Sequence, residues 1–445
     1  MPVVAPVAPR RAPTRRLHAD LVVVGLEVAL LGAAVLVGLV LNRRGVGLHA
    51  DAAPLFATWQ PHVGWGTPAA VLVAVAVIGW GVPWARTARW RALLGAAWVA
   101  AVSWTLALST VDGWSAGLAD RLTPQAEYLT EVPRVTDISS MLAGFAGRIL
   151  DFQPGSWSTH TAGHPPGALL VFVALDRVGL GGGTAAALAC VLIGATVAVS
   201  VPVTLRALGA PGAARAVLPY LVLLPGAVWV GAAADGIFAA VVAAGLALLV
   251  VRGTGTAAVG GLLLGFALYL SYGFVLVGIL AVAALALRRT GRAGALLAAL
   301  AGVATVAVAF TLAGFAWWAG YRLVAERYYQ GWAADRPYGY WVWANLAALV
   351  LSAGPVVGPA LLRAARAVRI RAERPVVLLP LAAALVIALS DLSGLSKAEV
   401  ERIWLPFLVW LLPAVALLPP RSHRWWLAGQ ALTALAVNHL LWTVS

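Results

Sequence analysis

Long apolar runs, separated by short polar segments, form the main pattern along the chain. A bilayer core about 30 Å thick requires about 20 apolar residues in each crossing helix, and fewer where a helix tilts or breaks. The pattern therefore predicts an all-α integral membrane protein with about 13 transmembrane helices. The runs cover residues 21–41, 68–84, 92–111, 184–205, 216–232, 236–251, 257–271, 272–287, 293–319, 341–362, 375–391, 403–418 and 425–443.

Composition supports the same class. Hydrophobic residues make up 62% of the chain and charged residues 11%, whereas soluble domains have roughly 45–50% and about 25%. A water-soluble domain of this length could not bury so much apolar surface, so lipid is the expected solvent for most of it. Cys190 is the single cysteine, which excludes a disulfide framework and a thiolate zinc site.

The net charge of +14 would suit a nucleic-acid partner, but the basic residues lie in short clusters between the apolar runs. Membrane proteins keep such clusters in cytoplasmic loops. The pattern, with its Arg- and Ala-rich usage, predicts a multi-pass plasma-membrane protein with a cytoplasmic N-terminus and no nucleic-acid partner. We expect a basic cytoplasmic tail at 1–20, a transmembrane hairpin at 21–91 and a main transmembrane domain at 92–445.

This orientation depends on the placement of residues 168–175. They are apolar but few, and they end at Asp176-Arg177 before a glycine-rich stretch. A crossing here would move the later basic clusters outside, so we expect a helix that lies in the outer interface. The long connections, which are usually functional, then all lie on the extracytoplasmic side: residues 42–67, 112–183, 320–340 and 392–402.

The connection 112–183 supplies carboxylates and imidazoles within one segment. Between residues 135 and 149 the apolar positions recur at helical spacing, which predicts an amphipathic helix on the membrane surface. The simplest alternative is that the charges only solvate an outer loop. The candidate residues here are Asp112, Glu127, Tyr128, His160 and His164.

Two later segments carry further candidates. Asp235 lies between two apolar runs, where a lone carboxylate costs several kcal/mol unless it has a partner. An Arg fork suits phosphate oxygens, and a neighbouring acid can hold the fork in place, although interfacial anchoring is the alternative. The second segment is 391–407, and its candidates are Lys397, Glu399, Glu401 and Arg402.

Other polar groups carry weaker signals. The aromatic residues of 320–343 fit a headgroup interface, and they could also stack on sugar rings. Arg322, Arg327 and Arg336 add cations on that side. The His and Asp residues of 42–67 lack a specific spacing, so no metal site is predicted. The short cytoplasmic connections and the lack of a Walker-type loop argue against an ATP-driven pump.

The order of these motifs resembles the C-type (GT-C) superfamily of polytopic membrane glycosyltransferases, which use polyprenyl-phosphate-linked sugars. The family has an acidic-plus-Tyr pattern in its first large outer loop, a later Pro-Pro pair and a carboxylate between later spans. The resemblance covers roughly residues 92–290. The similar positions are Glu127-Tyr128, His164-Pro165-Pro166 and Ala234-Asp235.

The resemblance implies transfer of a sugar from a polyprenyl-phosphate donor to an extracytoplasmic glycan, lipid or protein acceptor, with inversion. A carboxylate would take the proton from the acceptor hydroxyl. Glu127 is the implied base; Asp112 is its rival, because the family usually places an aspartate just beyond its first span. No cofactor is certain, and a divalent cation remains open. The implied substrate-binding residues are Tyr128, His160, His164, Asp235, Lys397, Glu399, Glu401 and Arg402.

A secondary transporter or lipid flippase is the main alternative. Such proteins place polar groups near the bilayer midplane, often in repeated halves. The chain has no convincing internal repeat, and its spans are almost free of charge apart from Glu27. A non-enzymatic scaffold, the third hypothesis, gives no reason for acids and phosphate-binding cations to share one face.

Overall fold

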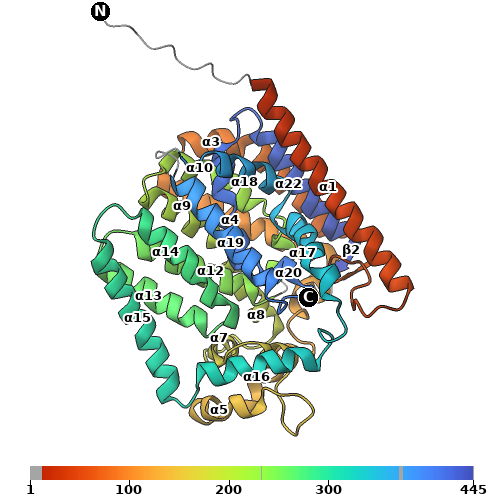
Figure 1. The fold of residues 1–445 in the computed structure, drawn as a ribbon, viewed down its shortest axis with the longest axis vertical. Helices are drawn as coiled ribbons and strands as arrows, with labels where there is room; N and C mark the ends of the chain where they lie inside the picture. Colours follow the sequence, from red (N-terminus) through yellow and green to blue (C-terminus); the bar gives the residue numbers. More distant parts are fainter. Residues whose placement is uncertain (1–12, 232, 370–373, 444–445) are drawn as a thin grey trace, which may run out of the picture.

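The fold is almost entirely helical (Figure 1). A computed structural model describes residues 13–231, 233–369 and 374–443. Residues 13–20 begin the first helix, and the rest of the predicted basic tail lies outside the described residues. The fold class predicted from the apolar pattern is therefore confirmed as all-α.

Within the described residues, six helical segments are long and apolar enough to cross a membrane. Their outward faces carry large apolar side chains, such as Leu36, Leu72 and Leu297, as expected for surfaces that face lipid. The six are α1 (Pro13–Arg43), α2 with α3 (Gly66–Ala76, Val82–Thr87), α4 (Trp90–Ser109), α8 with α9 (Gly183–Gly194, Val197–Ala207), α15 (Arg292–Leu312) and α19 (Arg374–Leu392).

A seventh candidate span is bent. The predicted run 341–362 forms α17 (Tyr338–Ala353) and α18 (Val357–Arg366), whose axes differ by 101°. Gly354 has a φ of 93°, and Pro355 follows it. A left-handed glycine ends a helix, and a proline cannot continue one. The Gly-Pro pair therefore explains the bend.

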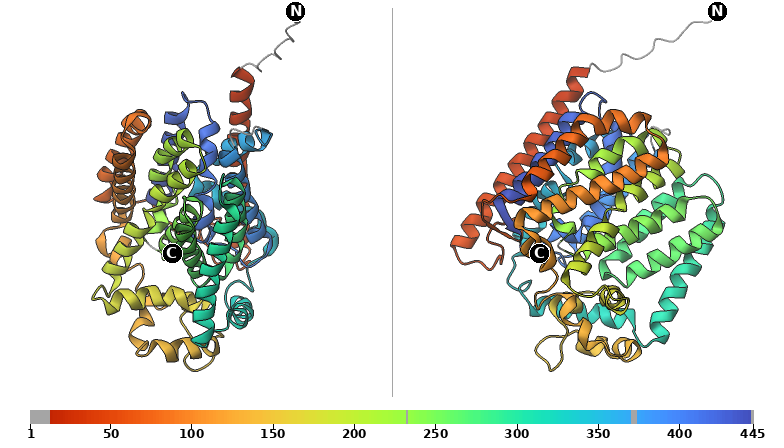
Figure 2. Two further views of the ribbon diagram at one scale, coloured as in Figure 1. Left: turned by 90° about the vertical axis from the view of Figure 1, so that its left-hand side faces the viewer. Right: turned by 180° about the vertical axis from the view of Figure 1, so that it is seen from behind.

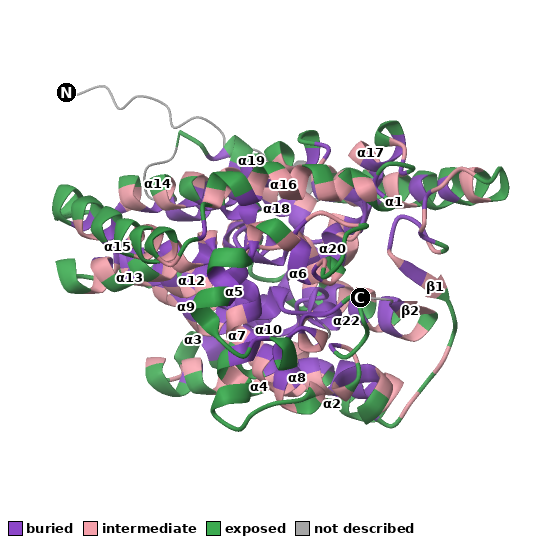
Figure 3. Cartoon of the chain, turned by 90° about the horizontal axis from the view of Figure 1, so that it is seen from below, coloured by how far each residue is buried: buried purple, intermediate pink, exposed green. Residues whose placement is uncertain are grey.

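The other predicted runs form shorter helices. Most have fewer residues than a straight crossing requires, and Figure 3 shows that buried residues are concentrated in the centre of the molecule, among helices that include α9 and α10. These shorter helices are α10 (Pro211–Val222), α12 (Asp235–Val250), α13 (Thr254–Leu268), α14 (Val277–Leu287), α21 (Leu405–Leu408) and α22 (His423–Leu440).

Connecting segments gather at one end of the bundle. In Figures 1 and 2, the end opposite the start of α1 carries α5, α7 and α16. The predicted amphipathic stretch 135–149 contains α5 and a 3-10 turn, and the predicted interfacial stretch 168–175 lies within α7. The connecting helices are α5 (Ile138–Gly144), α6 (Thr159–Gly163), α7 (Pro166–Arg177), α11 (Ala227–Val230), α16 (Trp317–Gln330) and α20 (Val400–Ile403).

The two strands join distant parts of the chain. β1 (Ala57–Trp59) pairs antiparallel with β2 (Leu441–Thr443), with Thr58 opposite Trp442. The segment after α1 is therefore fixed beside the segment after α22.

Glycines allow α13 and α15 to approach closely. A Cβ on Gly261 would lie 2.1 Å from the carbonyl oxygen of Ala299, and one on Gly302 would lie 2.4 Å from that of Ala258. Lipid tails are as apolar as the helix side chains, so the hydrophobic effect does not drive helices together within a bilayer. Helices in lipid associate instead through close packing at small residues such as these.

We expect Gly261→Val to lower the stability of the protein by about 1–3 kcal/mol, because the new side chain must push backbone apart. The measurement is thermal unfolding in detergent. Gly255→Ala is the matched control on α13, since nothing lies within 4 Å of a Cβ at that position. Equal melting temperatures for the two variants would contradict the close helix contact.

Candidate functional site

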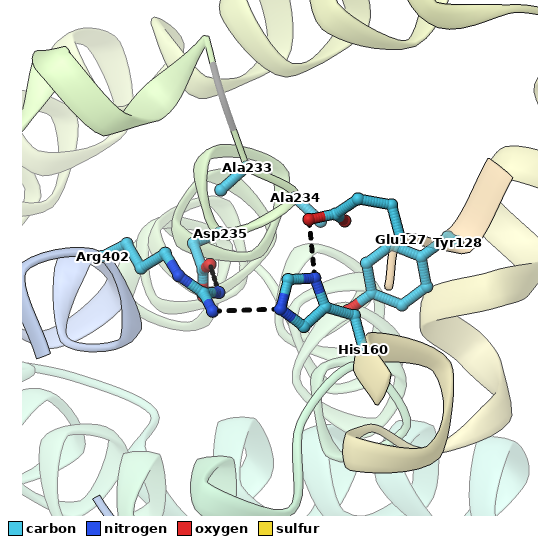
Figure 4. Close-up of a pocket in the computed structure, with 7 residues that line it drawn as sticks. All are labelled: Glu127, Tyr128, His160, Ala233, Ala234, Asp235 and Arg402. Atoms are coloured by element: carbon cyan, nitrogen blue, oxygen red, sulfur yellow. Dashed lines mark hydrogen bonds and ion pairs between the residues drawn. The ribbon is translucent and has the colours of Figure 1, made fainter. Parts of the chain in front are cut away.

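Three distant segments form one small polar pocket (Figure 4). It encloses about 230 Å³ of space, including its mouth. Loop 112–183 supplies one wall, the start of α12 a second and α20 the third. The lining residues are Glu127, Tyr128, His160, Ala233, Ala234, Asp235 and Arg402.

Arg402 occupies the centre of this pocket's hydrogen-bond network. Its Nη1 donates to Oδ2 of Asp235 at 3.2 Å, and its Nη2 donates to Oε2 of Glu399 at 2.6 Å. Only 5% of Arg402 is exposed. Burial opposes the charge, but the carboxylates of Glu399 and Asp235 outweigh it and raise the pKa of Arg402 above its usual value. Arg402 is therefore a buried, permanent cation.

His160 links Arg402 to Glu127. Nη2 of Arg402 lies 3.3 Å from Nε2 of His160, and Nδ1 of His160 lies 2.7 Å from Oε1 of Glu127. An arginine can only donate, so Nε2 must accept. His160 then carries its proton on Nδ1, the ring nitrogen that contacts the Glu127 carboxylate in Figure 4.

The loop backbone holds Glu127 in place. The backbone N–H of His160 donates to the carbonyl of Ala126 at 2.9 Å. The hydroxyls of Ser158 and Thr130 both donate to the carbonyl of Glu127, at 3.2 and 2.8 Å. Glu127 is only 7% exposed, so its carboxylate has a defined position beside His160.

Asp235 is the first residue of α12, a 16-residue helix. Negative charge is favoured at a helix N-terminus, where backbone N–H groups lack helical partners. The pairing with Arg402 supplies the second stabilising contact for this 5%-exposed carboxylate. The sequence indicated that a carboxylate between two apolar runs needs a partner, and the partner of Asp235 is Arg402.

Glu399 lies behind Arg402. It bridges two guanidinium groups, because Oε1 accepts from Nη1 of Arg336 at 3.2 Å while Oε2 accepts from Arg402. Burial alone would raise the pKa of Glu399, but the guanidinium groups of Arg402 and Arg336 hold it at about 2. Glu399 is therefore an anion at any physiological pH.

Tyr128 and His164 support the wall beside His160. The hydroxyl of Tyr128 lies 2.8 Å from Nδ1 of His164, which also lies 2.8 Å from the carbonyl of His160. The ring of Tyr128 stacks on Phe172 at 5.1 Å between centroids. Burial lowers the pKa of His164 to about 3, so this imidazole stays neutral and orients its neighbours.

Three predicted site residues lie away from the pocket. Asp112 contacts Nε2 of His62 at 2.5 Å and Nη2 of Arg121 at 3.1 Å. The Nζ of Lys397 donates to the carbonyl of Ala333 at 2.9 Å. In each case the charged group is engaged in a contact that ties connecting segments together.

Glu401, the third of these residues, is fully buried although it precedes Arg402 in the chain. Its Oε1 accepts the backbone N–H of Phe56 at 3.0 Å, and its Oε2 has no hydrogen-bond partner among the described residues. Burial raises the pKa of Glu401 to about 7 from 4.5. Below about pH 7 the Glu401 carboxyl group is therefore mainly protonated and neutral.

Glu401 makes stability depend on pH. Its folded-state pKa lies above the unfolded value, so its contribution is complete below about pH 4.5 and is lost as pH rises through about 7, an effect of about 3 kcal/mol. We expect Glu401→Gln to flatten the fall of melting temperature between about pH 5 and pH 8. Glu326→Gln, at an exposed position, should leave the wild-type pH profile intact; an unchanged profile in Glu401→Gln would assign the fall to another group.

Arg336 belongs to the network although sequence reasoning gave it only a general cationic role. The only feature of the sequence that pointed to Arg336 was its position in the aromatic connection 320–340.

Over residues 13–231, 233–369 and 374–443, no group of three or more His, Cys, Asp or Glu side chains is placed to hold a metal ion.

Comparison of the chain with protein-family models, curated proteins and solved structures finds no match.

Proposed function

We propose that the chain is a membrane glycosyltransferase of the GT-C type, which moves a sugar from a polyprenyl-phosphate donor to an extracytoplasmic acceptor. The acceptor is a cell-envelope glycan, a lipid or a protein. The observation that carries the proposal is the convergence of Glu127, His160, Asp235 and Arg402 in one pocket. It places a carboxylate and a cation close together, as attack on a sugar with a phosphate leaving group requires.

The proposal includes a topology. The shorter helices complete about thirteen crossings of the plasma membrane, with the N-terminus in the cytoplasm and the pocket near the outer leaflet. The gathering of α5, α7 and α16 at the end opposite the start of α1 supports this arrangement (Figure 1).

Glu127 acts as the general base. Its carboxylate takes the proton from the acceptor hydroxyl as the oxygen attacks the anomeric carbon. The new glycosidic bond forms while the bond from that carbon to the phosphate oxygen breaks, which inverts the configuration. The polyprenyl phosphate leaves with the electron pair, and Glu127 later releases the proton to water. In the proposal, His160 keeps the carboxylate in position through the contact of its Nδ1 with Oε1.

Arg402 stabilises the leaving phosphate. Its Nη1 has a second N–H besides the one that it gives to Asp235, and in the proposal that proton goes to a phosphate oxygen. Preorganised donors of this kind act on charge as it develops in the transition state. Asp235 and Glu399 keep the guanidinium in position.

An apolar cavity beside the pocket supports a lipid-linked donor. It encloses about 450 Å³, including its opening. Gly236 of its lining directly follows Asp235 in the chain, and Leu405 comes three residues after Arg402. In the proposal, the isoprenoid chain of the donor lies against this apolar lining while its phosphate reaches Arg402.

The direct test is transfer in membranes that contain the protein. Radiolabelled polyprenyl-phosphate pentoses and hexoses are supplied, and glycosylated product is separated from donor. Product that depends on the protein and is lost in Glu127→Gln is the expected result. Movement of label into sealed vesicles without product would instead identify a transporter or flippase.

A further inference from the structure

The turn that carries Glu399 has an unusual backbone. Ala398 and Glu399 both lie in the left-handed region, with φ of 69° and 62°. Residues with a Cβ adopt this region at a cost of about 1–2 kcal/mol each, and they remain there only where the surroundings hold them. The turn aims the side chain of Glu399 at Arg402, so a contact made to the Glu399 carboxylate bears directly on the geometry of the pocket.

The end of α16 and the segment after it hold this turn. The hydroxyl of Tyr328 accepts the backbone N–H of Lys397 at 2.8 Å. Nη1 of Arg336 donates to the carbonyl of Lys397 at 2.9 Å as well as to Oε1 of Glu399. One guanidinium thus contacts the turn at its backbone and at its carboxylate.

Arg336 is itself held from the opposite side. Its Nε donates to the carbonyl of Leu48 at 3.2 Å, and its Nη2 donates to that of His49 at 3.4 Å. Arg336 is 5% exposed. Its three nitrogens therefore connect the segment after α1 to the turn, and the guanidinium plane has little freedom to rotate.

We propose that Arg336 is a positioning residue for the transfer site, acting through Glu399 on Arg402. The inference rests on the proposed function, and it identifies a residue outside the pocket on which the pocket depends. Arg336, Glu399, Arg402 and Asp235 form a row of alternating charge.

The row controls how strongly Arg402 is held. With Arg336 present, Glu399 divides its two oxygens between two cations. Without Arg336, both oxygens turn to Arg402 and the left-handed turn loses two of its contacts. The guanidinium of Arg402 then moves toward Glu399 and away from His160 and Asp235, where the proposed phosphate binds.

A double-mutant cycle tests this coupling. Arg336→Met and the milder Arg336→Lys are each made in the wild type and in Glu399→Ala, and both turnover and melting temperature are measured. We expect Arg336→Met to lower kcat about tenfold in the wild type and less than about twofold in Glu399→Ala, with the fall in melting temperature present in both backgrounds. If Arg336→Met does not fold, Arg336→Lys carries the cycle.

The comparison of kcat between the two backgrounds separates positioning from general support. A purely structural Arg336 would lower kcat by the same factor in both backgrounds, and that result would overturn the inference. Tyr328→Phe is the matched control, because it removes the other contact to the same turn without changing the charge row. Its kcat should stay within about threefold of the wild type.

A second measurement does not depend on activity. A cryo-EM structure of the folded Arg336 variant should show the Arg402 guanidinium displaced from Nε2 of His160. An Arg402 that keeps its place would refute the inference even if transfer is observed. Absence of transfer by the wild type would refute the proposed function, and the Arg402 position would still decide the role of Arg336.

Discussion

Glu127→Gln is expected to abolish sugar transfer while the protein remains folded and binds its donor. The amide keeps the size and shape of the carboxylate and can still contact Nδ1 of His160, so the pocket keeps its shape, but an amide cannot take a proton from the acceptor. General-base catalysis contributes typically about 10²–10⁴-fold, and a loss of that size in kcat is expected. Turnover with labelled donor and binding of donor at equilibrium are the two measurements.

Asp112→Asn is the control for this experiment. Asp112 was the rival base in the sequence, but its carboxylate contacts His62 and Arg121 and does not line the pocket. We expect lower thermal stability and nearly unchanged kcat. Full activity in Glu127→Gln together with inactivity in a folded Asp112→Asn would transfer the role of base to Asp112.

Arg402→Lys is expected to lower kcat by about 10²–10³-fold, the usual effect of removing one preorganised donor to developing charge. A lysine keeps the charge but not the planar fork that reaches Asp235, Glu399 and His160 together. Because the charge remains, the two buried carboxylates keep a partner and the fold survives. Steady-state kinetics should show the loss mainly in kcat, with a smaller rise in KM.

Arg134→Lys provides the comparison for this substitution. Arg134 pairs with Glu131, and both lie in the connection 112–183. The side chain of Arg134 is 62% exposed, and exposed ion pairs contribute little to stability. We expect no measurable change in kcat. An Arg402→Lys variant as active as Arg134→Lys would remove Arg402 from the proposed mechanism.

Much of the candidate site could be predicted from the sequence. Glu127, His160, Asp235 and Arg402 were all named, and the structure brings them into contact around one pocket. The reason is physical: charged groups beside apolar runs need partners, so the isolated carboxylate at Asp235 and the cation at Arg402 were already informative. Their roles in transfer remain predictions.

The network behind the pocket could not be predicted in the same way. Arg336 meets Glu399 only because the connections after α16 and after α19 lie side by side. No local pattern marks it, since its sequence neighbours are aromatic residues suited to a membrane interface. The left-handed turn at Ala398 and Glu399 is equally hidden, because neither residue type favours that conformation.

The apolar runs of the sequence differ in the helices that they form. A run of apolar residues measures burial, whether in lipid or in protein. The run 403–418 forms α20, α21 and a 3-10 segment, broken near Pro406 and Pro413, and its residues lie in the core. In the part of the chain that the structure describes, six helical segments, or seven with the bent pair, are long and apolar enough to cross by themselves.

The distance along the chain between Asp235 and Arg402 affects how the protein is made. The ribosome adds the guanidinium 167 residues after the carboxylate that it neutralises. Until that addition, the growing polypeptide has an apolar helix that starts with an unpaired acid. The cation that pairs with Asp235 thus arrives only when the segment around Arg402 has been translated, and chains arrested earlier are expected to be substrates for quality-control proteases.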